Sequence, residues 1–159
     1  MEFGRLLLAM ADTRRIAMFV LGQYASGVMP ERLSEFQNAF TDYALSAYET
    51  QLDRLKGGRF TVTGSLMRAA DDFIVNAELS KSAGSGNREP LKLAVRVRAQ
   101  ADGSFVMTDM QFEGVWLAIS QRADFTAFLQ QHHGDIAALT GTLRSKTQNV
   151  SSAARGVAG

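Results

Sequence analysis

The sequence lacks cysteine and is poor in proline and histidine. Its 159 residues contain no Cys, 2 Pro and 2 His. Without cysteine the chain has no disulfide, no thiolate nucleophile and no cysteine-ligated zinc or iron–sulfur site. This absence fits either a reducing or an oxidising compartment, because a domain of this length buries enough surface to fold without covalent cross-links.

Long hydrophobic runs and an excess of charge of one sign are also absent. No apolar run approaches the ~20 residues that a membrane helix requires. The 17 Lys and Arg residues nearly balance the 16 Asp and Glu residues, which leaves a net charge of +1. Such a balance gives no global field that attracts polyanions, so the composition disfavours nucleic-acid binding. With 46% hydrophobic and 21% charged residues, the composition is that of a globular protein.

Two helices are expected before residue 58. Asp12 is a good N-cap for a short helix that ends at Gly22. Pro30 suits the first position of a longer helix, which Gly57-Gly58 ends. The apolar residues of this longer helix recur at spacings of three and four: Leu33, Phe36, Phe40, Tyr43, Ala44, Ala47, Tyr48, Leu52 and Leu55. This pattern predicts an amphipathic helix with one buried face.

From residue 59 the apolar period changes to two. The alternation predicts strands over 59–66, 73–80, 91–98 and 105–112, the last continuing to Ile119. On the first strand the predicted apolar face carries Phe60, Val62, Gly64 and Leu66. Because the turns between the strands are short, we expect an antiparallel meander with one buried face and one solvent face.

Two further helices are expected after the strands. Ser120 is a candidate cap for a helix that stops at Gly134, and Asp135 is a candidate cap for the next helix. Residues 147–159 are small or polar and show no periodicity, which predicts a flexible tail after a single domain of residues 1–146. The order of elements predicts an α+β fold, in which N-terminal and C-terminal helices cover one face of a curved antiparallel sheet of four or five meander strands. Such an NTF2-like cone holds a core if side chains fill it and a pocket if they leave a gap.

Motifs that carry catalysis are scarce in the sequence. It contains neither a G-x-S-x-G nucleophile turn nor a glycine-rich phosphate loop. His132 and His133 are neighbours, and adjacent helical residues point in different directions, so helix capping is favoured over a shared metal. We therefore expect no catalytic residue, no metal and no cofactor.

An acid/base site remains open as an alternative. Asp42 and Asp109, with Tyr24, Tyr43 and Tyr48, are residue types from which a cone-shaped fold builds an isomerase site, as ketosteroid isomerases do. Tyrosines on an apolar helical stripe are more often core residues with a satisfied hydroxyl group. The sequence does not show whether these side chains converge.

A basic stripe is expected on the third strand. Lys92, Arg96 and Arg98 alternate along one face. The aromatic residues that a nucleic-acid surface would need for base stacking are missing there. Cross-strand charge pairing with Glu78 and Glu113 on the flanking strands is the simpler interpretation.

Several strings in the sequence resemble a known family in their order and spacing. They are Ile16–Tyr24, Pro30-Glu31 before Phe36, Phe40 and Tyr48, Glu113–Leu117 before Arg122–Phe125, and Gly134–Ile136 before Leu139. Together they resemble the MlaC family of periplasmic lipid-binding proteins, also called toluene-tolerance auxiliary components. The hopanoid-associated HpnM branch is similar too. The likeness runs from about Phe3 to Lys146.

The resemblance implies a periplasmic carrier rather than an enzyme. Such a carrier binds the acyl chains of a phospholipid or hopanoid between helices and sheet, and shuttles the lipid between outer and inner membranes. Its transient partners would be an outer-membrane lipoprotein complex and an inner-membrane ABC transporter complex. Family members begin with a signal peptide and one or two further helices that are missing here, so we expect an N-terminally trimmed form.

The residues expected to line the lipid cavity are aromatic or aliphatic positions on several predicted elements. They are Phe19, Tyr24, Phe40, Tyr43, Tyr48, Val62, Val75, Val95, Val97, Val115 and Leu129. The alternatives to a lipid carrier are a small isomerase-like enzyme and a structural or interaction domain with a filled core.

Overall fold

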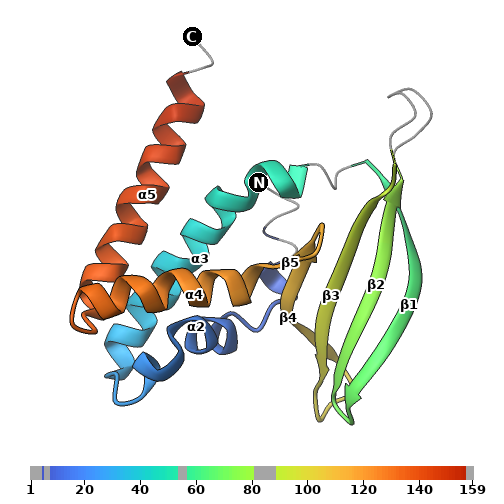
Figure 1. The fold of residues 1–159 in the computed structure, drawn as a ribbon, viewed down its shortest axis with the longest axis horizontal. Coiled ribbons are helices and arrows are strands. Elements are labelled where there is room, and N and C mark those ends of the chain that lie inside the picture. Colours follow the sequence, from blue (N-terminus) through green and yellow to red (C-terminus); the bar gives the residue numbers. More distant parts are fainter. Residues whose placement is uncertain (1–4, 6–7, 54–56, 81–88, 157–159) are drawn as a thin grey trace.

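The molecule consists of a layer of helices and one β-sheet that lie side by side (Figure 1). The computed structural model describes residues 5, 8–53, 57–80 and 89–156. The helices are α2 (Thr13–Leu21), the 3-10 helix η1 (Gly22–Ala25), α3 (Pro30–Asp53), α4 (Leu117–Gln131) and α5 (Ile136–Gly156). The strands are β1 (Arg59–Ala69), β2 (Asp72–Ser80), β3 (Leu91–Ala99), β4 (Phe105–Phe112) and β5 (Val115–Trp116).

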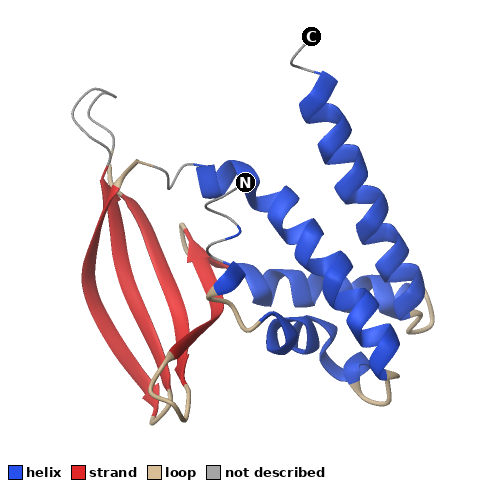
Figure 2. Cartoon of the chain, turned by 180° about the vertical axis from the view of Figure 1, so that it is seen from behind, coloured by secondary structure: helices blue, strands red, loops and turns tan. Residues whose placement is uncertain are grey.

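The five strands form one antiparallel sheet in the order β1-β2-β3-β4-β5. Seen from behind, the strands gather on one side and the helices on the other (Figure 2). Strands β4 and β5 lie next to the helices, and β1 lies farthest from them (Figure 1). The predicted α+β class is therefore confirmed, with a meander sheet that follows the N-terminal helices and precedes the C-terminal helices along the chain. Within the described residues, no helix is long and apolar enough to cross a membrane.

Local capping decides where the N-terminal and C-terminal helices begin. The Asp12 carboxylate accepts a hydrogen bond from the backbone N–H of Arg15 at 3.0 Å, as expected for the N-cap of α2. Pro30 is the first residue of α3, where its missing N–H costs no hydrogen bond. Asp135 precedes α5 and accepts from the N–H of Ala138 at 3.0 Å.

The predicted continuation of β4 to Ile119 is wrong. The chain reverses after Phe112, because Glu113 and Gly114 both have positive φ, 48° and 89°, and the short strand β5 then pairs back onto β4. Helix α4 begins at Leu117, before the expected cap Ser120. The reason is that Asp109 of β4 accepts a hydrogen bond from the N–H of Ala118 at 2.8 Å, so the sheet supplies the cap.

Residues 147–156, which belong to the segment expected to be a flexible tail, are helical, and the boundary of the domain at residue 146 stays a prediction. Helix α5 continues through Gly156. The hydroxyl groups of Thr147 and Ser152 donate to the carbonyls of Leu143 and Gln148, at 3.0 Å and 2.8 Å. Adding residues to an existing helix avoids the cost of nucleation, so an apolar stripe is not required for it to continue.

The predicted apolar face of β1 holds for only half of the strand. A β-bulge lies between Val62 and Gly64, so Gly64 and Leu66 point to the opposite face from Phe60 and Val62. A register argument from alternation alone fails here, because each bulge inserts one extra residue. The side chains of β1 are exposed along almost the whole strand.

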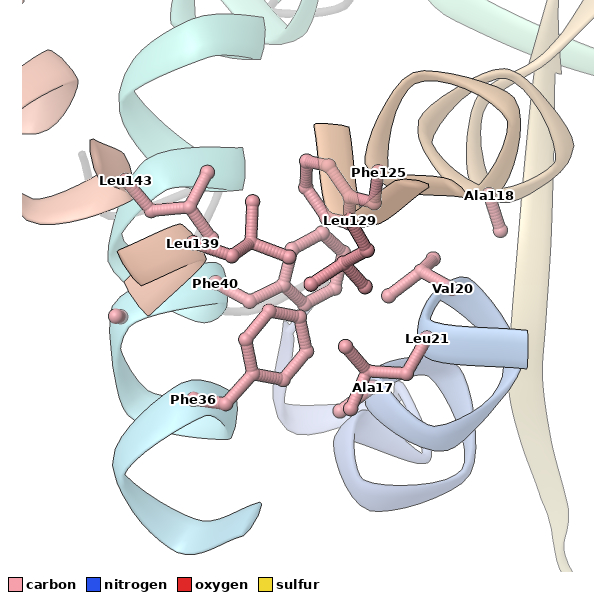
Figure 3. Close-up of a cluster of buried hydrophobic side chains, with 11 residues drawn as sticks. Ala17, Val20, Leu21, Phe36, Phe40, Ala118, Phe125, Leu129, Leu139 and Leu143 are labelled. Carbon is pink, nitrogen blue, oxygen red and sulfur yellow. The ribbon is translucent and has the colours of Figure 1, made fainter. Parts of the chain in front are cut away.

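The helices and the sheet have separate apolar clusters. In the helical core, Phe36 and Phe40 stack with ring centroids 5.9 Å apart, and Phe125 meets both rings edge-on at 6.1 Å and 5.8 Å (Figure 3). Aliphatic side chains from α2, α4 and α5 fill the space around them: Ala17, Val20, Leu21, Ala118, Leu129, Leu139 and Leu143. The cluster on the sheet is formed by Leu79, Leu93, Met110 and Phe112. The two clusters approach each other at β4, where α2 and α4 contact the sheet.

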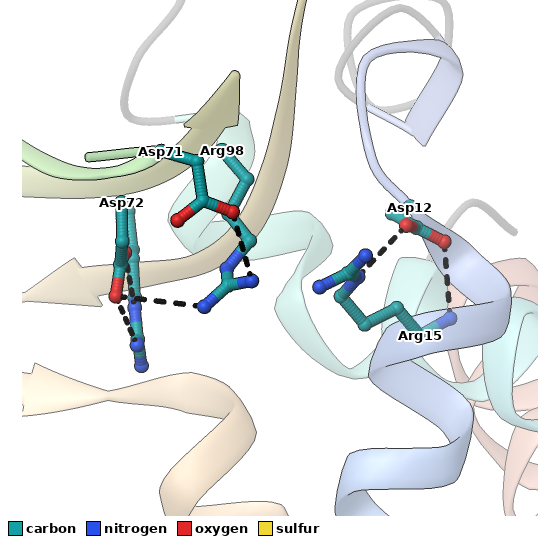
Figure 4. A network of polar contacts seen from close by, with 6 residues as sticks. Asp12, Arg15, Asp71, Asp72 and Arg98 are labelled. Atoms are coloured by element: carbon teal, nitrogen blue, oxygen red, sulfur yellow. Dashed lines mark hydrogen bonds and ion pairs between the residues drawn. The ribbon is translucent and has the colours of Figure 1, made fainter. Parts of the chain in front are cut away.

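A cross-strand ion pair fixes the opposite face of the sheet. Arg96 on β3 donates to both carboxylate oxygens of Asp72 on β2, at 2.9 Å and 2.6 Å. Arg98 pairs with Asp71 at 3.2 Å (Figure 4). The hydrogen bonds from Arg96 lower the pKa of Asp72. Cross-strand pairing of the basic stripe is thus present for Arg96 with Asp72 as its partner, whereas pairing of the stripe with Glu78 and Glu113 stays a prediction.

Replacing the buried partner of this pair should weaken the fold in a pH-dependent way. We expect Asp72→Asn to cost about 1–2 kcal/mol of unfolding free energy at pH 7. A carboxyl group whose pKa is lowered by folding stabilises the folded state at pH values above its unfolded pKa of about 3.9. This stabilisation is lost as the pH falls through the pKa of the folded state. The deficit of Asp72→Asn should therefore shrink below pH ~4. Urea unfolding at pH 7 and at a pH below ~4 tests this. The control is Asp71→Asn, which removes a carboxylate from the exposed pair and should change the free energy of unfolding by less than about 0.5 kcal/mol.

Candidate functional site

An apolar cavity lies where the helices meet strand β4. Its volume is about 120 Å³, and the surface of its wall is almost entirely carbon. We call it the junction cavity. Four parts of the chain line it: Leu8, Ala11, Thr13 and Ile16; Phe40, Thr41, Ala44, Leu45 and Tyr48; Met107, Thr108, Asp109 and Met110; and Leu117, Ala118 and Gln121.

Helix α3 supplies the longest side of the junction cavity. Phe40, Ala44 and Tyr48 are spaced four residues apart, so they lie on one face of the helix. The methyl group of Ala44 leaves room between the two aromatic rings. The amphipathic pattern of the sequence accounts for this face, but it does not show that a gap lies in front of it.

One polar contact crosses the wall of the junction cavity. The Nε2 group of Gln121 on α4 donates to the Tyr48 hydroxyl of α3 at 2.8 Å. Burial is the main cause that raises the pKa of Tyr48. The Oε1 atom of Gln121 is buried and has no hydrogen-bond partner within the described part of the chain. The hydrogen bond between Gln121 and Tyr48 therefore joins α4 to α3 on this side of the cavity, and the Tyr48 hydroxyl stays neutral at physiological pH.

The carboxylate of Asp109 joins the sheet to the helices at the cavity. Its Oδ1 accepts from the backbone N–H groups of Met110 and Ala118, both at 2.8 Å. Burial raises the pKa of Asp109, against the lowering effect of these backbone hydrogen bonds. Thr108 is the extra residue of a bulge opposite Arg96, which lets β4 turn toward α4 at this point.

A cleft lies next to the junction cavity. It has a volume of about 280 Å³ and shares Ile16, Thr108 and Asp109 with the junction cavity. Its remaining lining residues are Arg15, Phe19, Arg96 and Arg98. We call it the arginine cleft. An apolar cavity and a basic cleft are thus neighbours at one end of the sheet.

The structure distributes the predicted lining residues over four places: the junction cavity, the arginine cleft, the helical core and the sheet. Phe40 and Tyr48 line the junction cavity, and Phe19 lines the arginine cleft. Tyr24, Tyr43 and Leu129 pack in the helical core, where Leu129 is fully buried. The predicted valines lie on the sheet: Val95 packs on its apolar cluster, Val75 and Val97 neighbour it through the register, and Val62 and Val115 are exposed.

Sequence reasoning missed most of the residues that surround the junction cavity. Ala44 and Leu45 had a usable signal, because they adjoin predicted positions on the same helix. The bulge at Thr108 and the early start of α4 left no comparable signal, so these contributors were not predicted: Met107, Met110, Leu117, Ala118 and Gln121.

Only part of the candidate acid/base set comes together. Asp109 and Tyr48 both line the junction cavity, whereas Asp42 is exposed on α3. His132 stacks on Phe128 with centroids 3.9 Å apart, beside the C-terminus of α4. Among the described residues, no three His, Asp or Glu side chains gather where they could hold a metal ion.

The sheet, the helical layer and the apolar cavity between them define a class of α+β protein with an apolar cavity where its two layers meet. The MlaC protein family matches residues 2–145, so the chain belongs to the MlaC family. No curated protein matches the chain. The resemblance to the MlaC family is confirmed, and that to the HpnM branch stays a prediction.

A solved structure shares the fold. It is described as the phospholipid-binding protein from Ralstonia solanacearum in complex with a phospholipid. The two chains have 21% sequence identity and a TM-score of 0.75, over 91% of this chain and 77% of that chain. The helices and sheet of this protein are thus arranged as in that structure.

The role of Asp109 can be separated into hydrogen bonding and charge. Asp109→Ala should cost about 1–3 kcal/mol, because two buried N–H groups lose their acceptor. Asp109→Asn keeps an acceptor oxygen. Since folding raises the pKa of Asp109, the contribution of this residue to stability decreases as pH rises from below about 4 toward neutral. Asp109→Asn should therefore gain stability relative to wild type over that range. Urea unfolding at pH 4 and pH 7 measures both effects, and an Asn variant as unstable as the Ala variant at pH 7 would contradict this assignment.

Proposed function

We propose that this protein is a lipid carrier that binds an acyl chain in the junction cavity. The observation that carries the proposal is the apolar cavity at the junction of two separate cores. Transfer of hydrocarbon from water into such a site is favourable by about 0.8 kcal/mol per methylene. Membership of the MlaC family and the phospholipid-binding description of the structural neighbour support the same ligand class.

The size of the junction cavity suggests how a whole chain is accommodated. A cavity of ~150 Å³ binds one benzene molecule, so the observed 120 Å³ holds only a short part of an acyl chain. The helices and the sheet keep separate apolar clusters and touch mainly at β4 and β5. We propose that the ligand widens the gap between them, because such a shift leaves each cluster intact.

The cellular role follows from the family. We propose that the protein works in the periplasm and carries phospholipid or hopanoid between the outer and inner membranes. Its transient partners would be an outer-membrane lipoprotein complex and an inner-membrane ABC transporter complex. A phospholipid is the favoured cargo, since the structural neighbour is described in complex with one.

A small isomerase-like enzyme is the second candidate function. The observation that favours it is the presence of Asp109 and Tyr48 in one cavity, with burial raising both pKa values. Against it, Asp109 Oδ1 is already held by two backbone N–H groups, which is a structural use of the carboxylate. A carrier needs neither residue for chemistry.

Filling the junction cavity should remove the lipid without unfolding the protein. We expect wild-type protein from bacteria to retain lipid through purification, because empty apolar space costs dispersion contacts. Ala44→Phe places a ring in the cavity, so its lipid content should fall about tenfold or more, by exclusion of the chain. Ala127→Phe, on an exposed position of α4, is the matched control and should keep wild-type lipid content. Native mass spectrometry and organic extraction measure both. Lipid-free wild-type protein, or equal lipid in Ala44→Phe, would contradict the proposal.

A transfer assay separates the carrier from the enzyme. Labelled phospholipid in donor vesicles should reach acceptor vesicles chemically unchanged. Asp109→Asn should move lipid within a few fold of wild type, whereas removal of a general base lowers a reaction rate ~10²-fold or more. A modified lipid that forms with wild type and disappears with Asp109→Asn would establish the second candidate.

A further inference from the structure

We propose that the arginine cleft binds a phosphate group through Arg15, Arg96 and Arg98. The inference rests on the proposed function and deepens it, because it assigns the head of the ligand to a place beside the junction cavity. The shared chemistry is that of a phosphate oxyanion, whether it belongs to a lipid headgroup or to free inorganic phosphate.

The three guanidinium groups enter the cleft from two elements. Arg96 and Arg98 are two residues apart on β3 and share one face of the sheet, while Arg15 comes from the first turn of α2. Arg15 and Arg98 point toward the space between α2 and the sheet from opposite sides (Figure 4). Asp109 is the carboxylate that lines the same cleft, and burial raises its pKa, so three guanidinium groups face one carboxyl group there. An excess of positive charge around one space favours an anion in it.

Each arginine has a local carboxylate partner that leaves N–H groups available. Arg15 uses its Nε for Asp12 at 3.1 Å, and Arg96 uses Nε and Nη2 for Asp72. Arg98 uses Nη1 for Asp71 at 3.2 Å, and its Nη2 lies 3.9 Å from Asp72, which leaves its Nε and one N–H on each Nη. A guanidinium group carries five N–H donors in one plane, so these hydrogen bonds orient the side chain and leave other N–H donors available for a ligand. Arginine held in this way is suited to bidentate contact with phosphate oxygens.

The remaining wall of the cleft fits an amphipathic ligand. Ile16 and Phe19 add apolar surface beside the guanidinium groups. The volume of about 280 Å³ is more than twice that of the junction cavity. The two spaces are adjacent, because Ile16, Thr108 and Asp109 line both of them. An acyl chain in the junction cavity and a phosphate in the arginine cleft are therefore close enough to belong to the same lipid molecule.

Paired ligands that differ only in the phosphate test the inference. Isothermal titration calorimetry at constant ionic strength compares dihexanoylphosphatidic acid, dihexanoylglycerol and inorganic phosphate. Wild type should bind the phospholipid about tenfold or more tightly than the diacylglycerol, as charge-assisted hydrogen bonds to phosphate predict. The double variant Arg15→Gln/Arg98→Gln should lose that preference and any binding of inorganic phosphate. Arg14→Gln, an exposed neighbour outside the cleft, should leave both unchanged.

The outcomes separate this inference from the proposed function. Equal affinity for the two lipids in wild type would overturn the phosphate site while leaving the lipid carrier intact. Binding of inorganic phosphate that the double variant abolishes, without binding of either lipid, would support the site and contradict the carrier. Arg15→Gln alone keeps the test valid if the double variant unfolds, because the hydrogen bonds of Arg15 join only residues of one helix turn.

Discussion

The buried carboxylate of Asp109 is the contact on which the rest of the structure depends. One oxygen accepts from the strand that carries it and from the first turn of α4, so the sheet caps a helix of the neighbouring layer. Without this bond the start of α4 would leave unpaired N–H groups against an apolar wall. The bond joins the two layers directly beside the junction cavity, since Asp109 and Ala118 both line it.

Two apolar clusters and one limited junction explain both stability and binding. The aromatic cluster of Phe36, Phe40 and Phe125 stabilises the helices by itself, and the methionine and leucine cluster stabilises the sheet. Phe40 of the first cluster and Met110 of the second both line the junction cavity, so the cavity lies where the two clusters meet. We propose that a ligand chain enters at this junction, and that the arginine cleft next to it receives the polar end of an amphipathic molecule.

Local sequence signals predicted the elements better than the site. Asp12, Pro30 and Asp135 mark helix starts through their own chemistry, and alternation on β2 and β3 predicted the observed faces. The bulge after Val62 and the turn at Glu113-Gly114 broke the pattern, because an inserted residue changes the face and a reversed chain ends the strand. Of the cavity, Phe40 and Tyr48 were predicted, since they belong to an amphipathic helix. Met107, Leu117 and Gln121 were not, because their position depends on the long-range contact made by Asp109.

The most direct measurement of the central claim is photo-crosslinking with a phospholipid that carries a diazirine in the middle of one acyl chain. If the chain enters the junction cavity, mass spectrometry of the digested protein should find adducts on α3 between Phe40 and Tyr48 and on α4 between Leu117 and Gln121. Excess unlabelled phospholipid should suppress those adducts. Adducts confined to the exposed side chains of β1, with none on α3 or α4, would contradict a chain-binding cavity at the junction.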